Sequence, residues 1–188
     1  FVLNVSSPNT PGLRELQEVD HLSSILAECK MMSDRKGGGK PLLLKLSPDN
    51  NDEEIIASAQ MAMRRGIDGF VATNTTLHRP VPRNATSRSV FAESGGLSGR
   101  PLQARSKEVI RLLYEEVGSS VPIVGVGGID SADTAWQAVT SGASLLQLYS
   151  ALVFNGPSVV SGIVKGLKKR VKENGFLGIE EAVGIDIP

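Results

Sequence analysis

The sequence predicts an α/β fold built on a parallel sheet. Five short runs rich in Val, Ile and Leu are nearly continuous in apolarity, which is typical of strands buried on both faces. A helical pattern follows each run, and strict alternation of strands and helices implies parallel strands joined by right-handed crossovers. The predicted strands span residues 1–5, 42–46, 69–73, 121–126 and 144–149.

Apolar stripes and capping residues define the predicted helices. Asn51 and Asp52 are N-cap candidates for the second helix, and Asp130-Ser131 precedes the fourth. Pro157 suits the first position of the fifth helix. The stripes are Leu22, Ile25, Leu26 and Cys29; Ile55, Ile56, Ala59 and Met63; Leu102, Val109, Ile110 and Leu113; Ala135, Ala138 and Val139; and Ile163, Val164, Leu167 and Val171.

The composition describes one globular domain without a nucleic-acid footprint. The 188 residues are 40% hydrophobic, and 20 basic residues balance 20 acidic ones. The single cysteine, Cys29, excludes an internal disulfide and a cysteine-based metal cluster, and we expect a buried, inert thiol. No apolar run reaches the ~18 residues of a membrane span, and no signal peptide is evident. Because Phe1 lies inside a predicted strand, we interpret the chain as the C-terminal portion of a longer protein, with any targeting or membrane segment upstream.

Polar residues at the carboxyl ends of the strands favour a closed (β/α)8 TIM barrel over an open sheet. A barrel brings these ends together around one site, whereas an open sheet spreads them along an edge. We therefore expect residues 1–188 to be the C-terminal part of a single barrel domain, holding about the last five βα units. The residues at the strand ends are Asn4, Lys45, Thr73, Asn74, Gly127, Gly128 and Tyr149.

The first strand ends in a cluster of Asn, Ser, Thr, Pro and Gly. Pro8 and Pro11 lack the N–H that a strand ladder requires, so the strand cannot continue. Carboxamides and hydroxyls at the carboxyl end of a barrel strand predict a ligand site. The alternative is an Asx- and Ser-rich turn that caps the next helix.

Lys45 interrupts an otherwise apolar strand. An unpaired ammonium group there would cost several kcal/mol, so it needs an anionic partner or a route to water. No acidic residue occupies the equivalent position of another predicted strand, which favours a bound anionic ligand. The alternative is a lysine that extends from the strand end into solvent.

The last two strands supply a candidate phosphate site. Gly127-Gly128 ends the penultimate strand before a capped helix, and Tyr149-Ser150 ends the last strand. Loops in these positions of a barrel commonly bind phosphate through backbone N–H groups, and glycine lets the backbone approach the ligand. The alternative is a tight packing turn.

A phosphate site with a lysine in a barrel suggests FMN, because a cation near the flavin ring stabilises its anionic reduced form. No His, Asp or Glu lies at a strand end, since His21 falls on a predicted helix and His78 in a loop. We expect no metal site. A hydroxyl would then act as the base, and neutral carboxamides would bind an anionic substrate without repelling it.

Two connections are unusual. Residues 77–100 form a loop much longer than an ordinary βα loop, and long loops at the catalytic face of a barrel are commonly functional. Its basic residues Arg79, Arg83 and Arg88 are interpreted as a solvated face. Residues 36–40 form a glycine-rich surface loop to which we assign no function.

Six motifs resemble dihydroorotate dehydrogenase. The resemblance covers essentially the whole chain and favours class 2, the membrane-associated, quinone-reducing enzymes, because Ser7 stands where class 1 enzymes carry a cysteine. The motifs are Asn4-Val5-Ser6-Ser7-Pro8-Asn9-Thr10, Leu44-Lys45, Thr73-Asn74-Thr75-Thr76, Gly95-Gly96-Leu97-Ser98-Gly99, Val126-Gly127-Gly128 and Gln147-Leu148-Tyr149.

The resemblance implies a role for each motif. Ser7 would remove the C5 proton of dihydroorotate, Thr10 would hydrogen-bond to Ser7 and relay the proton, and residues 8–16 would form a lid. Asn4, Asn9, Asn74 and Thr75 would bind the substrate. The residues implied for FMN are Asn4, Lys45, Thr73, Ser98, Gly99, Gly127, Gly128, Tyr149 and Ser150, the last in place of the threonine usual in relatives.

The resemblance also implies partners and a location. Dihydroorotate would be oxidised to orotate in pyrimidine biosynthesis, with a quinone as final electron acceptor bound through upstream segments. The protein would be membrane-associated, on the mitochondrial inner membrane of a eukaryote or the cytoplasmic face of a bacterial inner membrane. The alternatives are a class 1 enzyme, another FMN barrel such as a dihydrouridine synthase, and an inactive barrel acting as a binding module.

Overall fold

The computed structural model describes residues 1–10, 12–35, 39–82 and 84–188. Its centre is a five-stranded parallel sheet in the order β1-β2-β3-β4-β5, so every strand pairs with its neighbour in the chain. All five predicted strands are confirmed, with slightly shorter bounds. The strands are β1 (Val2–Asn4), β2 (Leu43–Leu46), β3 (Gly69–Ala72), β4 (Ile123–Val126) and β5 (Leu145–Gln147).

The predicted helices are confirmed, and further short helices occur between them. The helices that follow the five strands are α1 (Val19–Arg35), α2 (Asp52–Arg64), α4 (Gln103–Val117), α5 (Ala132–Thr140) and α7 (Ser158–Glu173). The short ones are α3 (Ala85–Phe91), α6 (Ser150–Asn155) and the 3-10 helices η1 (Leu13–Gln17), η2 (Arg100–Leu102) and η3 (Ile179–Ala182).

Side-chain caps fix two of the helix starts. Asn51 and Glu54 form a reciprocal capping box at α2, where the Asn51 side chain accepts the Glu54 N–H at 2.8 Å. Ser131 and Thr134 do the same at α5. Pro157 lies one residue earlier than predicted, at the N-cap of α7, because the helix begins at Ser158.

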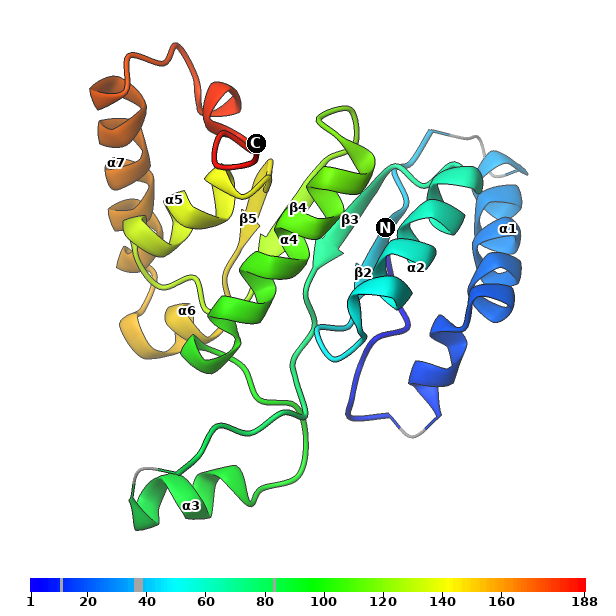
Figure 1. Ribbon diagram of the computed structural model, residues 1–188, viewed down its shortest axis with the longest axis horizontal. Helices are drawn as coiled ribbons and strands as arrows, with labels where there is room; N and C mark the ends of the chain where they lie inside the picture. Colours follow the sequence, from blue (N-terminus) through cyan, green and yellow to red (C-terminus); the bar gives the residue numbers. More distant parts are fainter. Residues whose placement is uncertain (11, 36–38, 83) are drawn as a thin grey trace.

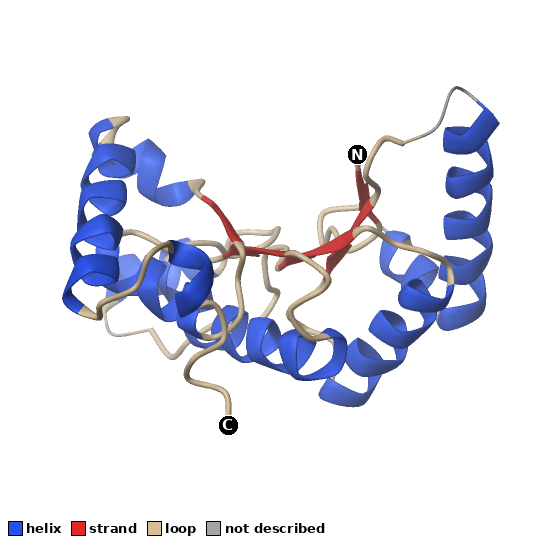
Figure 2. Cartoon of the chain, turned by 90° about the horizontal axis from the view of Figure 1, so that it is seen from above, coloured by secondary structure: helices blue, strands red, loops and turns tan. Residues whose placement is uncertain are grey.

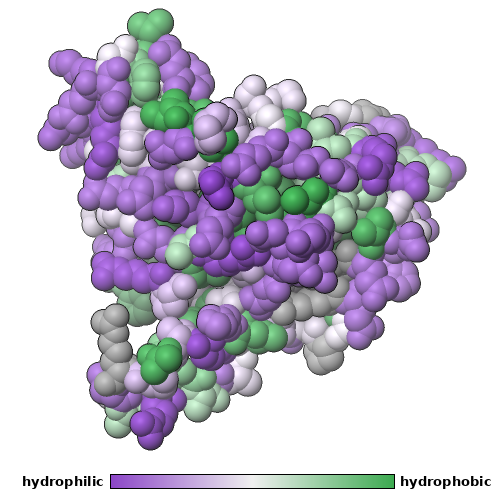
Figure 3. All heavy atoms as spheres, in the orientation of Figure 1, coloured by the Kyte–Doolittle hydropathy of each residue, from purple (hydrophilic) through white to green (hydrophobic). Residues whose placement is uncertain are grey.

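The long helices lie on one side of the sheet in an arc (Figure 2). In β2 the buried Leu44 and Leu46 alternate with the half-buried Leu43 and Lys45, as expected when one face packs on helices. The hydrophobic core lies on the helix side and includes the fully buried Leu44, Phe70 and Ile123. The helix-covered face is largely hydrophilic, with hydrophobic patches between helices (Figure 3).

The opposite, inner face of the sheet carries the polar strand ends. Asn4 pairs in register with Lys45, and Lys45 with Val71, so these three side chains lie side by side on that face. The inner face is exposed at the two edge strands, where Val2 is 51% and Leu145 59% exposed. Within the described ranges, no helix is long and apolar enough to cross a membrane. Parallel strands in chain order with helices outside form part of a (β/α)8 barrel, as predicted.

Candidate functional site

A cavity of about 730 Å³ opens at the carboxyl ends of β2 to β5. It is walled by the strand ends, by the start of α6 and by the returning part of the long β3–α4 connection. Ten predicted site residues line it, including every predicted cofactor residue except Asn4. They are Lys45, Thr73, Asn74, Thr75, Ser98, Gly99, Gly127, Gly128, Tyr149 and Ser150.

Gly127 and Gly128 form the cavity wall beneath the end of β4. Their φ angles are 133° and 70°, which favour glycine. A Cβ on Gly128 would lie 2.6 Å from the Cβ of Gln103, and one on Gly127 would lie 2.9 Å from the Cβ of Ser106. The turn is therefore a packing turn against the first two turns of α4, and this packing brings its backbone to the cavity. The packing-turn and ligand-site interpretations are compatible.

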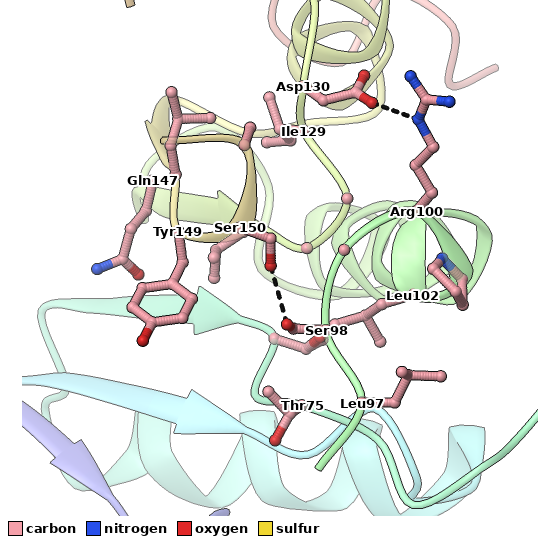
Figure 4. A pocket seen from close by; sticks show the side chains of 18 of the residues that line it. Thr75, Leu97, Ser98, Arg100, Leu102, Ile129, Asp130, Gln147, Tyr149 and Ser150 are labelled. Atoms are coloured by element: carbon pink, nitrogen blue, oxygen red, sulfur yellow. Dashed lines mark hydrogen bonds and ion pairs between the residues drawn. The ribbon is translucent and has the colours of Figure 1, made fainter. Parts of the chain in front are cut away.

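Two polar pairs also line the cavity (Figure 4). The Ser98 and Ser150 hydroxyl oxygens are 2.8 Å apart and join the long connection to the start of α6. Arg100 Nε donates to Asp130 Oδ2 at 2.6 Å, and this carboxylate raises the pKa of Arg100. Tyr149 lies at the rim and is 73% exposed. The Arg100–Asp130 pair was not predicted, since its partners are 30 residues apart.

Lys45 extends from β2 into the cavity. No carboxylate pairs with it in the part of the chain that the structure describes, and burial lowers its pKa. A half-buried ammonium without an acidic partner fits an anionic ligand better than the solvent-exposed alternative.

Asn74 joins the cavity to the first strand. Its Nδ2 donates to Asn4 Oδ1 at 2.9 Å and to Ser6 Oγ at 3.1 Å, while its Oδ1 accepts the Thr75 N–H at 2.9 Å. The Ser6 hydroxyl in turn donates to Asn4 Oδ1 at 3.3 Å. Both donors point at the carboxamide oxygen of Asn4, so its Nδ2 faces away from them and is left to donate to a ligand.

Ser7 lies in the turn after β1, beside the cavity but outside its lining. Its Oγ accepts the Asn9 N–H at 3.3 Å, and Asn9 Oδ1 accepts the Gly96 N–H at 2.8 Å. Among the described residues no hydrogen bond joins Ser7 to Thr10, and Thr10 is exposed. The cavity and the Ser7 turn are therefore linked through Asn74 and Gly96, and Thr10 takes no part in this hydrogen-bond network.

Thr75 shows how closely these segments approach. Its Oγ1 is the buried side-chain oxygen that has no hydrogen-bond partner in the described ranges. A Cβ on Gly96 would lie 1.9 Å from that oxygen and 2.8 Å from Pro8 Cγ. Glycine at position 96 thus allows the long connection to close over Thr75 and the Ser7 turn, a function that the sequence analysis did not assign.

The long connection corrects one interpretation. Arg79 is half-buried and donates to the backbone carbonyls of Thr76, Phe91, Glu93 and Gly95, so it does not belong to a solvated face. Arg88 is exposed on α3, as expected. Arg83 lies outside the described residues, as do residues 36–38 of the glycine-rich loop.

The two histidines and the cysteine lie apart from the residues that line the cavity. Where the structure is described, no three His, Cys, Asp or Glu residues are grouped so that they could hold a metal ion. His21 lies on α1 and His78 in the long connection, and both are exposed. Cys29 is free and half-buried, less enclosed than expected.

A sheet in chain order, helices outside it and a cavity at the carboxyl ends of the strands define an α/β protein of the barrel class. Residues 1–171 match the family described as dihydroorotate dehydrogenase. The chain belongs to the dihydroorotate dehydrogenase family.

Individual relatives agree with this assignment. The chain is 45% identical over 189 residues to the quinone dihydroorotate dehydrogenase of Trichodesmium erythraeum, covering 98% of this chain and 49% of that protein. It is 45% identical over 188 residues to the enzyme of the same name from Nautilia profundicola, with 100% and 49% coverage. A crystal structure of Eimeria tenella DHODH with ferulenol superposes with a TM-score of 0.91 at 33% identity, over 100% of this chain and 54% of that one. The chain thus spans about half the length of the relatives it matches.

Proposed function

We propose that this chain is the C-terminal part of the barrel domain of a class 2 dihydroorotate dehydrogenase, which oxidises dihydroorotate to orotate in pyrimidine biosynthesis and reduces a quinone. The observation that carries the proposal is that the same end of the sheet holds a half-buried Lys45, which pairs with no carboxylate among the described residues, and a carboxamide cluster next to the Ser7 hydroxyl. Relatives named for the quinone reaction support it.

The cavity residues fit FMN. Lys45 offers a cation to the flavin ring, and Gly127-Gly128, Ser98 and Ser150 offer backbone N–H groups and hydroxyls to a phosphate. The buried Thr75 hydroxyl, which has no hydrogen-bond partner among the described residues, indicates a missing polar ligand in the same cavity. Bound FMN supplies a hydride acceptor.

Ser7 would accept the substrate proton. Its Oγ already accepts the Asn9 N–H, which fixes the turn and favours a developing alkoxide at that oxygen. Asn4 and Asn9 each have the carboxamide oxygen engaged, so their Nδ2 groups are oriented as donors to an anionic, carbonyl-rich substrate. The segment around Gly96 and Leu97 would exclude water. Thr10 as a proton relay stays a prediction.

Quinone reduction and membrane association belong to the same proposal. Both would use segments upstream of Phe1, and the location would be the mitochondrial inner membrane or the cytoplasmic face of a bacterial inner membrane.

The test is a dihydroorotate–quinone assay on the intact purified protein. A flavin spectrum, bleaching of that flavin by dihydroorotate and reoxidation by a quinone are expected. Absence of flavin would favour a binding module. Bound flavin that dihydroorotate does not reduce would favour another FMN barrel, and reduced flavin that quinone does not reoxidise would favour class 1.

A further inference from the structure

The connection between β3 and η2 extends away from the sheet and carries α3 at its far end (Figure 1). We call residues 73–82 its outgoing leg and residues 91–99 its returning leg, and the two legs meet at a narrow neck. At the neck, Thr76 and Leu97 form an antiparallel bridge, with N–H···O distances of 3.1 and 2.7 Å. Asp49 supports the outgoing leg, because its carboxylate accepts the Thr76 hydroxyl and, at 2.8 Å, the Leu77 N–H.

Arg79 ties the two legs together. Its Nη1 donates to Thr76 O on the outgoing leg at 3.0 Å. Its Nε donates to Phe91 O at 3.3 Å, and its Nη2 donates to the carbonyls of Glu93 and Gly95, all on the returning leg. No carboxylate pairs with Arg79 in the described ranges. A guanidinium has five donors in a fixed fork, so one side chain can hold several carbonyls that an ammonium group cannot.

The carbonyl that Arg79 holds is one residue from a group that touches the Ser7 turn. Gly96, next to Gly95, donates its N–H to Asn9 Oδ1 at 2.8 Å. Asn9 donates its own N–H to Ser7 Oγ at 3.3 Å. Three consecutive contacts thus connect Arg79 to the hydroxyl proposed as the base, across segments separated by 87 residues at the Asn9–Gly96 step.

We propose that Arg79 is a positioning residue that orients Ser7 through Gly95, Gly96 and Asn9. The inference rests on the proposed function only for the consequence in catalysis. Its structural part concerns the returning leg: without the guanidinium, Gly96 is free to move from Asn9, and the Ser7 turn loses its contact with the long connection. Displacements of ~1 Å at a reacting group can slow a reaction ~10²-fold.

The experiment compares Arg79→Met with Arg88→Met in the intact holoprotein. Arg88 is a matched control, because it lies on α3 of the same connection, carries the same charge, is exposed and makes no side-chain hydrogen bond or ion pair among the described residues. Hydrogen–deuterium exchange follows peptides covering residues 5–10 and 93–98, and rapid mixing with dihydroorotate follows flavin reduction. Arg79→Met should raise exchange in both peptides about 10-fold or more and slow flavin reduction ~10–100-fold at unchanged flavin content. Arg88→Met should match the wild type.

A cycle with Asn9→Ala tests the route. If Arg79 acts through Asn9, the double variant should reduce flavin no more slowly than Asn9→Ala alone, whereas independent effects would multiply. Arg79→Lys should restore part of the rate; if Arg79→Met fails to fold, this variant and Arg79→Gln are compared instead. Unchanged exchange at residues 5–10 or multiplicative effects would overturn the inference. Exchange does not require turnover, so a protein that dihydroorotate fails to reduce would refute the proposed function and leave this test intact.

Discussion

The cavity has a glycine wall, Gly127 and Gly128, and beside the cavity lies a polar cluster around Ser7. The other members of this Ser7 cluster are Asn4, Ser6, Asn9 and Asn74. Both regions lie at the same end of the sheet, but different interactions stabilise them. Gly127 and Gly128 pack against the first turns of α4, whose Val109 and Ile110 are 0% and 1% exposed. The Ser7 cluster lies at the carboxyl end of the edge strand β1 and in the turn after it, and hydrogen bonds between distant segments hold it.

This difference matches the two ligands that the site is proposed to bind. A wall built into the core is preformed and suits a cofactor that stays bound. Each neutral hydrogen bond contributes only ~1 kcal/mol to stability. The Ser7 turn and the long connection, which such bonds hold together, can therefore separate and close again, as substrate exchange requires. Changes in the wall should therefore alter stability and cofactor content, and changes in the cluster should alter rate.

Ser7→Ala, a change within the Ser7 cluster, should have the largest effect on the rate of flavin reduction. Loss of a general base costs roughly 10²–10⁴-fold in rate. Flavin reduction by dihydroorotate should fall by about that factor, while flavin content and orotate binding remain close to wild type. Ser7→Cys is the control that should retain part of the rate, with a pH profile shifted by the lower thiol pKa. A near-normal rate in the alanine variant would exclude Ser7 as the base.

Gly128→Ala and Gly96→Ala compare the two regions directly. Gly128→Ala places a Cβ 2.6 Å from Gln103 Cβ at a residue with a φ of 70°, so α4 or the glycine wall must shift. We expect the free energy of unfolding to fall by about 2 kcal/mol and the flavin content to fall with it.

The second variant should act locally. A Cβ at Gly96 meets Thr75 Oγ1 and Pro8 Cγ, neither of which belongs to the hydrophobic core. Gly96→Ala should therefore change denaturant midpoints little and slow flavin reduction ~10-fold or more. Equal destabilisation by both variants would contradict the distinction between a core-supported wall and a hydrogen-bonded cluster.

The two regions also differ in what the sequence could predict. Local apolar patterns and caps were enough to predict every strand and long helix. Barrel geometry predicted that residues at the strand ends meet at one site, and Lys45, Thr73 and the glycine pair do line the cavity. The roles of Gly96 and Arg79 depend on contacts between segments brought together only by folding, so no local pattern marks them. The helix α3 was missed because its seven residues carry no apolar stripe.

Lys45→Met tests the cation at the boundary of the two regions. Burial lowers the Lys45 pKa, so in the ligand-free protein the charged form is disfavoured and its replacement should raise the melting temperature by about 2 °C near neutral pH. The same change should weaken flavin binding ~10-fold or more. Thermal unfolding of the flavin-free protein and flavin titration measure the two effects.

The effect of Lys45→Met on stability should depend on pH. Below its lowered pKa, Lys45 is protonated in both the folded and the unfolded chain, and the cost of burying the charge is fully present. As pH rises through that lowered pKa toward the unfolded value, the folded chain loses the proton first. The stability advantage of Lys45→Met should then shrink, and flavin affinity of the wild type should fall over the same range. Lys45→Arg should bind flavin without that fall, since arginine stays charged.

Ser98→Ala should give the smallest effect, because it removes a contact that joins the two regions but belongs wholly to neither. Ser98 lies on the returning leg of the long connection and Ser150 at the start of α6, with their hydroxyl oxygens 2.8 Å apart. A neutral hydrogen bond contributes ~0.5–1.5 kcal/mol, and Ser150 in the variant can turn its hydroxyl to the phosphate or to water. Flavin affinity should therefore fall only about 2–10-fold, mostly through faster dissociation as the connection opens more often. Ser150→Ala should cost at least as much, since Ser150 lies at the start of α6 and not on the connection that opens. A larger loss for Ser98→Ala than for Ser150→Ala, measured by stopped-flow flavin dissociation, would mean that the connection, and not the wall, retains the cofactor.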